Sequence, residues 1–335
     1  MHIGVMGTGA IGGYLGGRLA VAGHRVTLVG RTRFGETLAA EGMHLTGLDT
    51  APIHLPLSPA FRYTTDPAEL SDCDAVLVCV KGRDTEAAGA TLAETLPPSA
   101  VVVSCQNGLR NPDRLRAVLP EAVVLAGMVS FNVIREGPAL TQTTSGPIAI
   151  GQHDGREAPL LAAFKSTGLP SLSHSDMPGI LWGKLQFNLN NAINALSGLP
   201  IREQLSDRDF RRLLSEVMHE GLAAQRAAGI TPRRLGKMLP RIAPHVLPLP
   251  DWLFFRVSGA MLKIDPAARS SMWDDLSRRK PTEIDFLNGE IVTLGQQHSI
   301  PTPLNARIVS LIKAAEVANT GSPGLTAAQI RPPTP

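Results

Sequence analysis

The first 31 residues of this 335-residue chain constrain its fold more than any other segment. A short apolar run, Ile3 to Met6, leads into Gly7-Thr8-Gly9-Ala10-Ile11-Gly12, and a helical apolar pattern then runs to Gly23. Arg25 to Gly30 has the composition of a second strand. In such a unit the first glycine makes the tight turn, the second lets the backbone approach a pyrophosphate, and the third lets helix and strand pack closely. The segment therefore predicts a dinucleotide site, with the helix N-terminus facing the phosphates.

The residues after the second strand indicate which dinucleotide the site takes. NAD-binding units usually carry Asp or Glu about 20 residues after the glycines, where the carboxylate accepts hydrogen bonds from the ribose 2′-hydroxyl. This chain has Arg31 there, and its next acidic residue is Glu36. A guanidinium can hold a 2′-phosphate with two hydrogen bonds, whereas a carboxylate would repel it. We therefore predict NADP(H) as the cofactor. The other interpretation of Arg31 is a solvated strand end.

Composition narrows the class of protein. With 43% hydrophobic residues the chain can fill two cores, and its formal net charge is only +3. No basic cluster is interleaved with aromatic residues, so we expect no nucleic-acid partner. No stretch reaches the roughly 20 apolar residues that span a bilayer, so we expect a cytoplasmic protein with no membrane partner. Cys73, Cys79 and Cys105 lack CxxC spacing, and we expect no metal site.

Strand and helix signals alternate through the first half of the chain. Short apolar runs typical of buried parallel strands lie at Asp74–Val80, Ala100–Cys105 and Val123–Met128. Helical segments separate these runs. Two later segments, Ala139–Thr143 and Pro147–Ile150, are short and flanked by glycines, which favours antiparallel strands that close the sheet edge. Repeated strand–helix units predict an α/β domain with a doubly wound parallel sheet.

The second half reads as helical. Between its predicted helices lies Pro232–Pro266, a proline-rich segment whose path the sequence does not indicate. The predicted helices are Ile180–Ser197, Asp207–Gly229 and a helical stretch over Ser271–Gln297. We therefore expect an NADP-binding domain over residues 1–176, an all-helical substrate domain over 177–325 and a flexible tail over 326–335.

A polar stripe on the first predicted helix is the sharpest candidate for chemistry. Lys184, Asn188 and Asn191 fall within about 60° of one another at 3.6 residues per turn. A lysine and two amides on one stripe among apolar neighbours would hold a polar ligand. The alternative is a surface lysine that snorkels along the helix.

Further candidates lie elsewhere in the chain. Ser271 and Glu283 fall in the last helical stretch, and Glu283 could pair with Lys184 or accept a hydrogen bond from a ribose. Lys81 and Asn107 follow two predicted strands, where a doubly wound sheet places ligand contacts. An exposed helix carboxylate and an ordinary Asn-Gly turn are the alternative interpretations of Glu283 and Asn107.

Taken in order along the chain, these features resemble one family, the ketopantoate reductases (2-dehydropantoate 2-reductases). The resemblance covers nearly the whole chain. It comprises Gly7-Thr8-Gly9-Ala10-Ile11-Gly12-Gly13, Arg31, Val80-Lys81, Asn107-Gly108, Trp182-Gly183-Lys184-Leu185, Asn191-Ala192-Ile193-Asn194-Ala195-Leu196, Ser270-Ser271-Met272 and Thr282-Glu283-Ile284-Asp285.

The resemblance implies a fold, a reaction and a role for each candidate. It implies a Rossmann domain followed by a helical domain like that of 6-phosphogluconate dehydrogenases. The reaction is reduction of 2-dehydropantoate by NADPH to (R)-pantoate, in pantothenate and coenzyme A biosynthesis. Lys184 would protonate the ketone oxygen, and Glu283 would contact the cofactor ribose and order the lysine. The remaining roles are substrate binding for Asn188 and Ser271, and cofactor binding for the glycine loop (Gly7 to Gly12), Lys81, Asn107 and Arg31, which would hold the 2′-phosphate.

Two departures from the family pattern leave the substrate open. The second substrate asparagine of familiar members lies where this chain has Ala192, so Asn191 or Asn194 would take its place. The Pro232–Pro266 segment is also long for the family and could reshape the pocket. The alternatives are a paralogue that reduces another branched or aromatic 2-oxo acid, a catalytically silent NADP(H)-sensing protein, and a structural or interaction module. A homodimer also remains open.

Overall fold

The computed structural model describes residues 1–48, 50–234, 239–259 and 267–331. Within these ranges the chain forms two compact units, Met1–Met177 and Pro178–Pro335. We describe each unit by itself. Much of the Pro232–Pro266 segment falls in the described ranges, but residues 235–238 and 260–266 lie outside them, as do residues 332–335 of the predicted tail.

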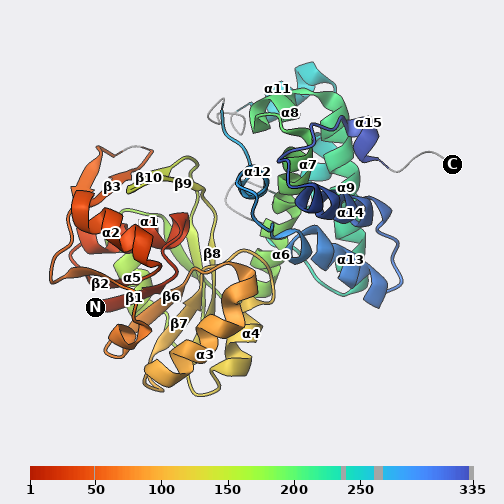
Figure 1. The fold of residues 1–335 in the computed structure, drawn as a ribbon. Helices are drawn as coiled ribbons and strands as arrows, with labels where there is room; N and C mark the ends of the chain where they lie inside the picture. The colour runs from red at the N-terminus through yellow and green to blue at the C-terminus, as the bar shows by residue number, and fades with distance from the viewer. Residues whose placement is uncertain (49, 235–238, 260–266, 332–335) are drawn as a thin grey trace. The chain divides into compact units, whose positions relative to one another are not determined.

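Unit 1 is built on an eight-stranded sheet with the order β12-β11-β8-β7-β6-β1-β2-β5 (Figure 1). All neighbouring strands are parallel except β8 and β11, which pair antiparallel. This confirms the predicted parallel α/β sheet. The strands are β1 (His2–Met6), β2 (Arg25–Val29), β5 (Phe61–Thr64), β6 (Ala75–Val78), β7 (Val101–Ser104), β8 (Val123–Val129), β11 (Ile148–Gly151) and β12 (Ser171–His174).

Helices cover both faces of this sheet because its strands are apolar on both sides. In β6, Leu77 joins the core on the face of α1, whereas Val76 and Val78 join a second core with residues of α3 and α4. Figure 1 shows α3 and α4 side by side. The helices of unit 1 are α1 (Ala10–Val21), α2 (Thr32–Glu41), α3 (Thr85–Thr95), α4 (Asn111–Val118), α5 (Ala158–Ser166) and the short 3₁₀ helices η1 (Pro67–Leu70) and η2 (Gly82–Asp84).

A second, four-stranded sheet with the order β4-β3-β10-β9 lies on the other side of α1. Its strands are β3 (Met43–Thr46), β4 (Ile53–Leu55), β9 (Val133–Glu136) and β10 (Ala139–Gln142). Glycines let α1 approach both sheets: a Cβ at Gly16 would lie 2.5 Å from Leu28 of the large sheet, and one at Gly17 would lie 2.7 Å from Met43 of the small sheet. Helix α1 therefore forms the layer between the two sheets.

The predicted antiparallel edge is correct for one segment and wrong for the other. Strand β11 does continue the large sheet, antiparallel to β8, although β12 pairs beyond it. Strand β10 instead leaves that sheet, pairing antiparallel with β9 and parallel with β3. Its Leu140 is fully buried and packs against α1, which explains why the strand lies in the second sheet.

The regular secondary structure of unit 2, among its described residues, is all helical, as predicted. The longest helix, α9, is amphipathic and packs against several of the others. The helices are α6 (Met177–Asn188), α7 (Asn190–Ser197), α8 (Ile201–Ser206), α9 (Arg208–Ala227), α10 (Ala243–Val246), α11 (Asp251–Ser258), α12 (Ser271–Ser277), η3 (Ile284–Phe286), α13 (Asn288–Gln297), α14 (Pro303–Ala318) and α15 (Ala327–Ile330).

Two predicted helical stretches are divided in the structure. The first is interrupted by a single turn residue, Leu189, between α6 and α7. The second ends after α12 because Arg279 adopts a left-handed conformation (φ 55°), and Pro281, which lacks an N–H, follows it. A new helix, α13, begins only after η3.

The prediction of a flexible tail from residue 326 is wrong for residues 326–331. Thr326 and Gln329 form a capping box that starts α15, and Ile330 is fully buried in contact with neighbouring helices. Arg331 then pairs with Glu216 of α9, with 3.1 Å between Nη2 and Oε1. These contacts order residues 326–331, although the proline content of the C-terminal segment had predicted a flexible tail.

Candidate functional site

The glycine loop between β1 and α1 has one open position and two closed ones. Gly7 adopts φ 102°, and a Cβ there would lie 2.7 Å from the Val80 nitrogen. A Cβ at Gly12 would collide with the Gly7 carbonyl. A Cβ at Gly9 would meet nothing within 4 Å. Gly7 thus makes the turn, Gly12 lets the helix pack on the strand, and Gly9 leaves open space beside the backbone.

The loop fits the pyrophosphate of a dinucleotide. Gly9 is the N-cap of α1, and no side chain caps that helix end by a hydrogen bond. The backbone N–H groups of a first turn are partners for phosphate oxygens, and the helix dipole favours the negative charge. Thr8, Ala10 and Ile11 of the predicted set lie in this same loop and first turn.

The end of β2 holds Arg31 beside the glycine loop. The Tyr63 hydroxyl of β5 donates to the Arg31 carbonyl at 2.8 Å and lies 3.3 Å from the Thr8 hydroxyl. A Cβ at Gly30 would overlap both hydroxyls, so only glycine fits between them. The Arg31 backbone is therefore anchored, while its side chain is exposed at the N-cap of α2.

Arg135 of β9 also lies at the glycine loop, and it was not predicted from the sequence. Its Nη1 donates to the Thr8 carbonyl at 2.9 Å, and its guanidinium lies over the Phe34 ring, 4.5 Å from the ring centroid. Phe34 in turn packs edge-on against Tyr63. Arg135 lies 127 positions from Thr8, in a sheet whose pairing the local pattern did not reveal.

The loops after β6 and β7 are tied together by a buried amide. Gln106 donates to the Val80 carbonyl at 3.1 Å and to the Thr85 hydroxyl at 2.7 Å. Asn111 extends the network, since its amide donates to the Asn107 carbonyl at 2.6 Å. Lys81 and Asn107 follow these two parallel strands at their carboxyl ends, on the same sheet edge as the glycine loop. The structure thus brings the predicted cofactor-binding residues of unit 1 to one edge.

In unit 2, α6 presents Lys184 and Asn188 on one stripe, about 40° apart around the helix. Gly183 precedes the lysine because the backbone of Arg233 crosses the helix there: a Cβ at Gly183 would collide with the Arg233 carbonyl. The Arg233 N–H donates to the Gly179 carbonyl at 2.8 Å. The crossing segment secures the turn of α6 that carries Lys184.

Asn194 is not available to a substrate, which corrects one of the two alternatives for the second asparagine. The residue is fully buried. Its amide nitrogen donates to the Leu199 carbonyl and to Gln204 Oε1, both at 2.9 Å, and its oxygen accepts from the Ser270 N–H at 2.8 Å. Each polar atom of the side chain therefore has a structural partner, and Asn194 holds α7 to the start of α12.

Asn191 and Ser271 lie next to this junction. The Ser270 hydroxyl, which caps α12, donates to the Asn191 carbonyl at 2.9 Å. Neither the Asn191 nor the Ser271 side chain makes a hydrogen bond with any residue that the structure describes. The same holds for the Asn188 amide. Of the two alternatives, only Asn191 has a side chain that is not committed to such contacts, and its substrate role remains a prediction.

Glu283 lies at the N-cap of η3, and its carbonyl accepts from the Phe286 N–H at 3.0 Å. The neighbouring Thr282 N–H donates to Glu316 of α14 at 2.7 Å, which anchors this turn to the helix. The catalytic and cofactor roles of Glu283 remain predictions.

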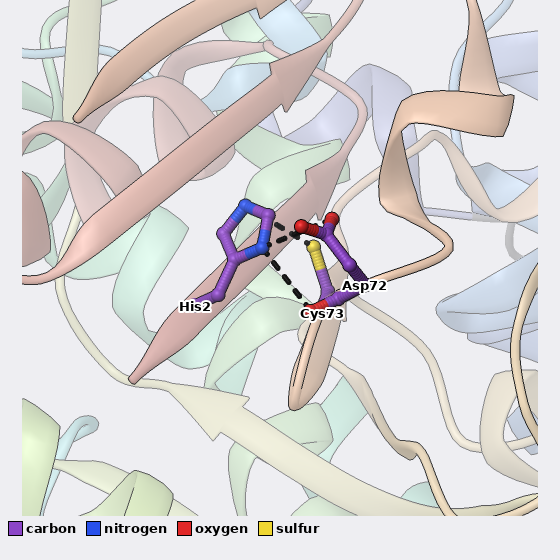
Figure 2. A group of neighbouring side chains, drawn as sticks. All are labelled: His2, Asp72 and Cys73. Atoms are coloured by element: carbon purple, nitrogen blue, oxygen red, sulfur yellow. Dashed lines mark hydrogen bonds and ion pairs between the residues drawn. The ribbon is translucent and has the colours of Figure 1, made fainter. Parts of the chain in front are cut away.

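A cluster of His2, Asp72 and Cys73 lies at the start of the large sheet (Figure 2). The two imidazole nitrogens serve different neighbours: Nδ1 lies 3.2 Å from Asp72 Oδ1, whereas Nε2 lies 2.9 Å from the Thr27 hydroxyl and 3.5 Å from Cys73 Sγ. Burial raises the pKa of Cys73 to about 12, which disfavours the thiolate that metals require. The cluster is a hydrogen-bonded junction between β1 and the segment before β6.

The burial of His2 at this junction leads us to predict that the protein loses stability in acid. Burial lowers the pKa of His2, with a further contribution from Arg25 and Arg62 that Asp72 partly opposes. The folded state therefore binds fewer protons than the unfolded chain, whose histidine pKa is about 6.5. The stability that the neutral His2 contributes is complete above that pH, and it is lost as the pH drops through the folded pKa. Urea denaturation followed by circular dichroism should show this fall, and the fall should be smaller in His2→Gln. An equal fall in both proteins would exclude His2 as a cause.

Among the described residues, no helix combines the length and the apolar character needed to cross a bilayer.

Two family models match the chain. The model described as ketopantoate reductase PanE/ApbA matches residues 3–155, and the model of the C-terminal part of the same family matches residues 176–316. The chain is 27% identical over 324 residues to the 2-dehydropantoate 2-reductase of Halobacterium salinarum, covering 94% of this chain and 99% of that protein. It is 29% identical over 315 residues to that of Caulobacter vibrioides, covering 93% and 98%.

A comparison with solved structures also matches this family. The crystal structure of a PanE/ApbA family ketopantoate reductase from Ralstonia eutropha JMP134 matches with a TM-score of 0.81 and 31% identity, over 95% of this chain and 99% of that one. A Rossmann-type unit with an open glycine loop, followed by a helical unit, defines the class as a dinucleotide-dependent oxidoreductase. The chain belongs to the ketopantoate reductase (PanE/ApbA) family.

Proposed function

We propose that the protein reduces 2-dehydropantoate to (R)-pantoate with NADPH, a step of pantothenate and coenzyme A biosynthesis. The observation that carries this proposal is that the chain aligns over almost its whole length with curated 2-dehydropantoate 2-reductases. The Lys184 stripe and the open position at Gly9 agree with such a reaction. Unit 1 is the proposed cofactor-binding domain, and unit 2 is the proposed substrate domain.

Most of the proposed cofactor contacts come from unit 1. The first turn of α1 would bind the pyrophosphate, and Arg31 would bind the 2′-phosphate with paired hydrogen bonds. Lys81 and Asn107 would contact the cofactor at the carboxyl ends of β6 and β7. Glu283 would accept a hydrogen bond from a ribose hydroxyl.

The substrate contacts come from unit 2. Asn188, Asn191 and Ser271 would hold the 2-oxo acid with amide and hydroxyl groups, and the Lys184 ammonium would donate a hydrogen bond to the ketone oxygen. NADPH supplies the hydride in this chemistry. Negative charge builds on the ketone oxygen as the carbon is reduced, so an ammonium already in place stabilises the transition state more than the ground state. Lys184 then transfers its proton to that oxygen.

Arg31→Asp should weaken the binding of NADPH and reduce the preference of the enzyme for NADPH over NADH. The change removes a charge-assisted contact and adds a repulsive carboxylate at the 2′-phosphate. We expect the KM for NADPH to rise by roughly 10- to 100-fold, the equivalent of one or two such hydrogen bonds, with a smaller change for NADH. Steady-state kinetics with both cofactors measure this. An unchanged ratio of the two KM values would refute the role of Arg31.

The direct test is NADPH oxidation with 2-dehydropantoate, run beside NADH and a panel of branched and aromatic 2-oxo acids. Fast turnover of 2-dehydropantoate with NADPH supports the proposal. Turnover of another oxo acid alone would retain the mechanism and identify a paralogue with a different substrate. Cofactor binding without turnover of any oxo acid would favour the NADP(H)-sensing alternative. A cytoplasmic location is part of the proposal, and a homodimer stays a prediction.

A further inference from the structure

Arg135 lies at the glycine loop but comes from a different part of the fold. It is in β9 of the small sheet, which packs on α1. Its Nη1 donates to the Thr8 carbonyl at 2.9 Å, and its guanidinium covers the Phe34 ring at 4.5 Å. These two contacts fix both the position and the plane of the guanidinium. A preorganised planar cation loses little side-chain entropy when it binds an anion.

The neighbours of Arg135 identify which end of a dinucleotide it would face. Phe34 is in the first turn of α2, directly after Arg31, and Tyr63 is on β5. Strand β5 pairs with β2 at the edge of the sheet, and α2 packs against β5. In dinucleotide-binding units, the adenosine ribose lies at the end of the second strand. Arg135 would therefore lie beside the adenosine ribose of a bound dinucleotide.

The positive charge of Arg135 affects the neighbouring Tyr63 hydroxyl. Burial raises the pKa of Tyr63, and the positive charge of Arg135 acts in the opposite direction. The Tyr63 hydroxyl also donates to the Arg31 carbonyl. A single cluster thus joins the backbone of Arg31, the Tyr63 hydroxyl and the guanidinium of Arg135.

We propose that Arg135 is a second specificity-determining residue of the cofactor site, which binds the 2′-phosphate of NADP(H) together with Arg31. This inference rests on the proposed NADP(H) dependence and deepens it. Two guanidiniums from separate sheets would then share one phosphate dianion, Arg31 from the end of β2 and Arg135 from β9. The glycine loop would be coupled to this phosphate through the Thr8 carbonyl.

The test compares two ligands that differ only in the 2′-phosphate. Binding of 2′,5′-ADP and of 5′-AMP to the full-length protein is measured by calorimetry for wild type, Arg135→Gln and Arg135→Lys. We expect Arg135→Gln to weaken 2′,5′-ADP by about tenfold or more, as the loss of a charge-assisted contact implies, and to change 5′-AMP less than twofold. Arg135→Lys retains the charge without the planar fork, so it should recover part of the affinity for 2′,5′-ADP alone.

The control is Arg156→Gln, which removes the same charge from unit 1 at an exposed arginine that donates to the Ser99 carbonyl. It should change neither affinity. The double variant Arg31→Gln/Arg135→Gln should lose less than the product of the two single losses, because both arginines contact one phosphate.

Each contrary result has a separate meaning. Equal weakening of both ligands in Arg135→Gln would show that Arg135 only supports the loop, and unchanged binding would show no role; either result overturns the inference while the proposed function stands. A wild-type protein that binds 2′,5′-ADP no better than 5′-AMP would overturn both. The melting temperature of each variant, measured with and without ligand, separates misfolding from a lost contact.

Discussion

Lys184→Ala should lower kcat by roughly 10²- to 10⁴-fold, the range for loss of a positioned general acid. The ammonium is expected to act on the ketone oxygen as negative charge develops there, so its removal raises the barrier more than it weakens substrate binding. Steady-state rates with 2-dehydropantoate and NADPH measure kcat. Binding of NADPH to the same variant, followed by calorimetry, should change little because Lys184 is not among the proposed cofactor contacts.

A matched control for this prediction is Lys165→Ala. Lys165 is an exposed lysine in the last turn of α5, so the substitution removes the same charge and side chain without touching the proposed site. Its kcat should equal that of wild type. Turnover near the wild-type rate in Lys184→Ala would refute the acid role and leave the polar stripe of α6 without a catalytic function.

Arg211→Met should destabilise unit 2 by about 2–4 kcal/mol. Arg211 of α9 has no exposed surface, and its guanidinium donates to four backbone carbonyls and to Asp251 while lying 4.3 Å from the Phe254 ring centroid. Methionine fills much of the space but leaves those acceptors without their donor, at a cost of about 1–3 kcal/mol for each one that water does not reach. The four carbonyls are those of Leu205, Ser206, Leu247 and Leu249.

The design of this experiment uses the tryptophans of the chain. All three, Trp182, Trp252 and Trp273, lie in unit 2, so urea denaturation followed by tryptophan fluorescence reports on that unit. The control is Arg212→Met at the adjacent position, where an exposed arginine pairs with Asp209 at 3.6 Å. Such a pair contributes about 0.5 kcal/mol or less. Equal losses in the two variants would contradict the role assigned to Arg211.

The strands and helices of unit 1 could be predicted closely where the signal is local. β1, α1 and β2 follow from a glycine turn between two apolar runs. β6, β7 and β8 follow from continuous apolar segments that only a sheet covered on both faces can bury. Strands β5 and β12 were not predicted because each is short and only partly apolar, and their pairing with β2 and β11 depends on residues far away in the chain.

In unit 2, the spacing of apolar residues predicted that helices form but not where each one ends. A helical pattern continues across Leu189, yet the structure divides α6 from α7 there. The tail was predicted from its proline content, whereas the Thr326–Gln329 capping box and the buried Ile330 determine its structure. The path of the Pro232–Pro266 segment depends in part on Arg211, whose contacts at Leu247 and Leu249 cross about 36 to 38 positions.

The sequence alone determined the dinucleotide loop, the position of Arg31 and the Lys184–Asn188 stripe, because each depends on spacing within one or two turns of chain. Only the tertiary structure distinguishes Asn191 from Asn194, since both are amides on the same helix and differ in what surrounds them. Asn194 is fully buried, and its side chain makes three hydrogen bonds within unit 2. The tertiary structure also brought Arg135 to Thr8 across 127 positions, because the pairing of β9 and β10 with β3 depends on packing against α1 rather than on local sequence.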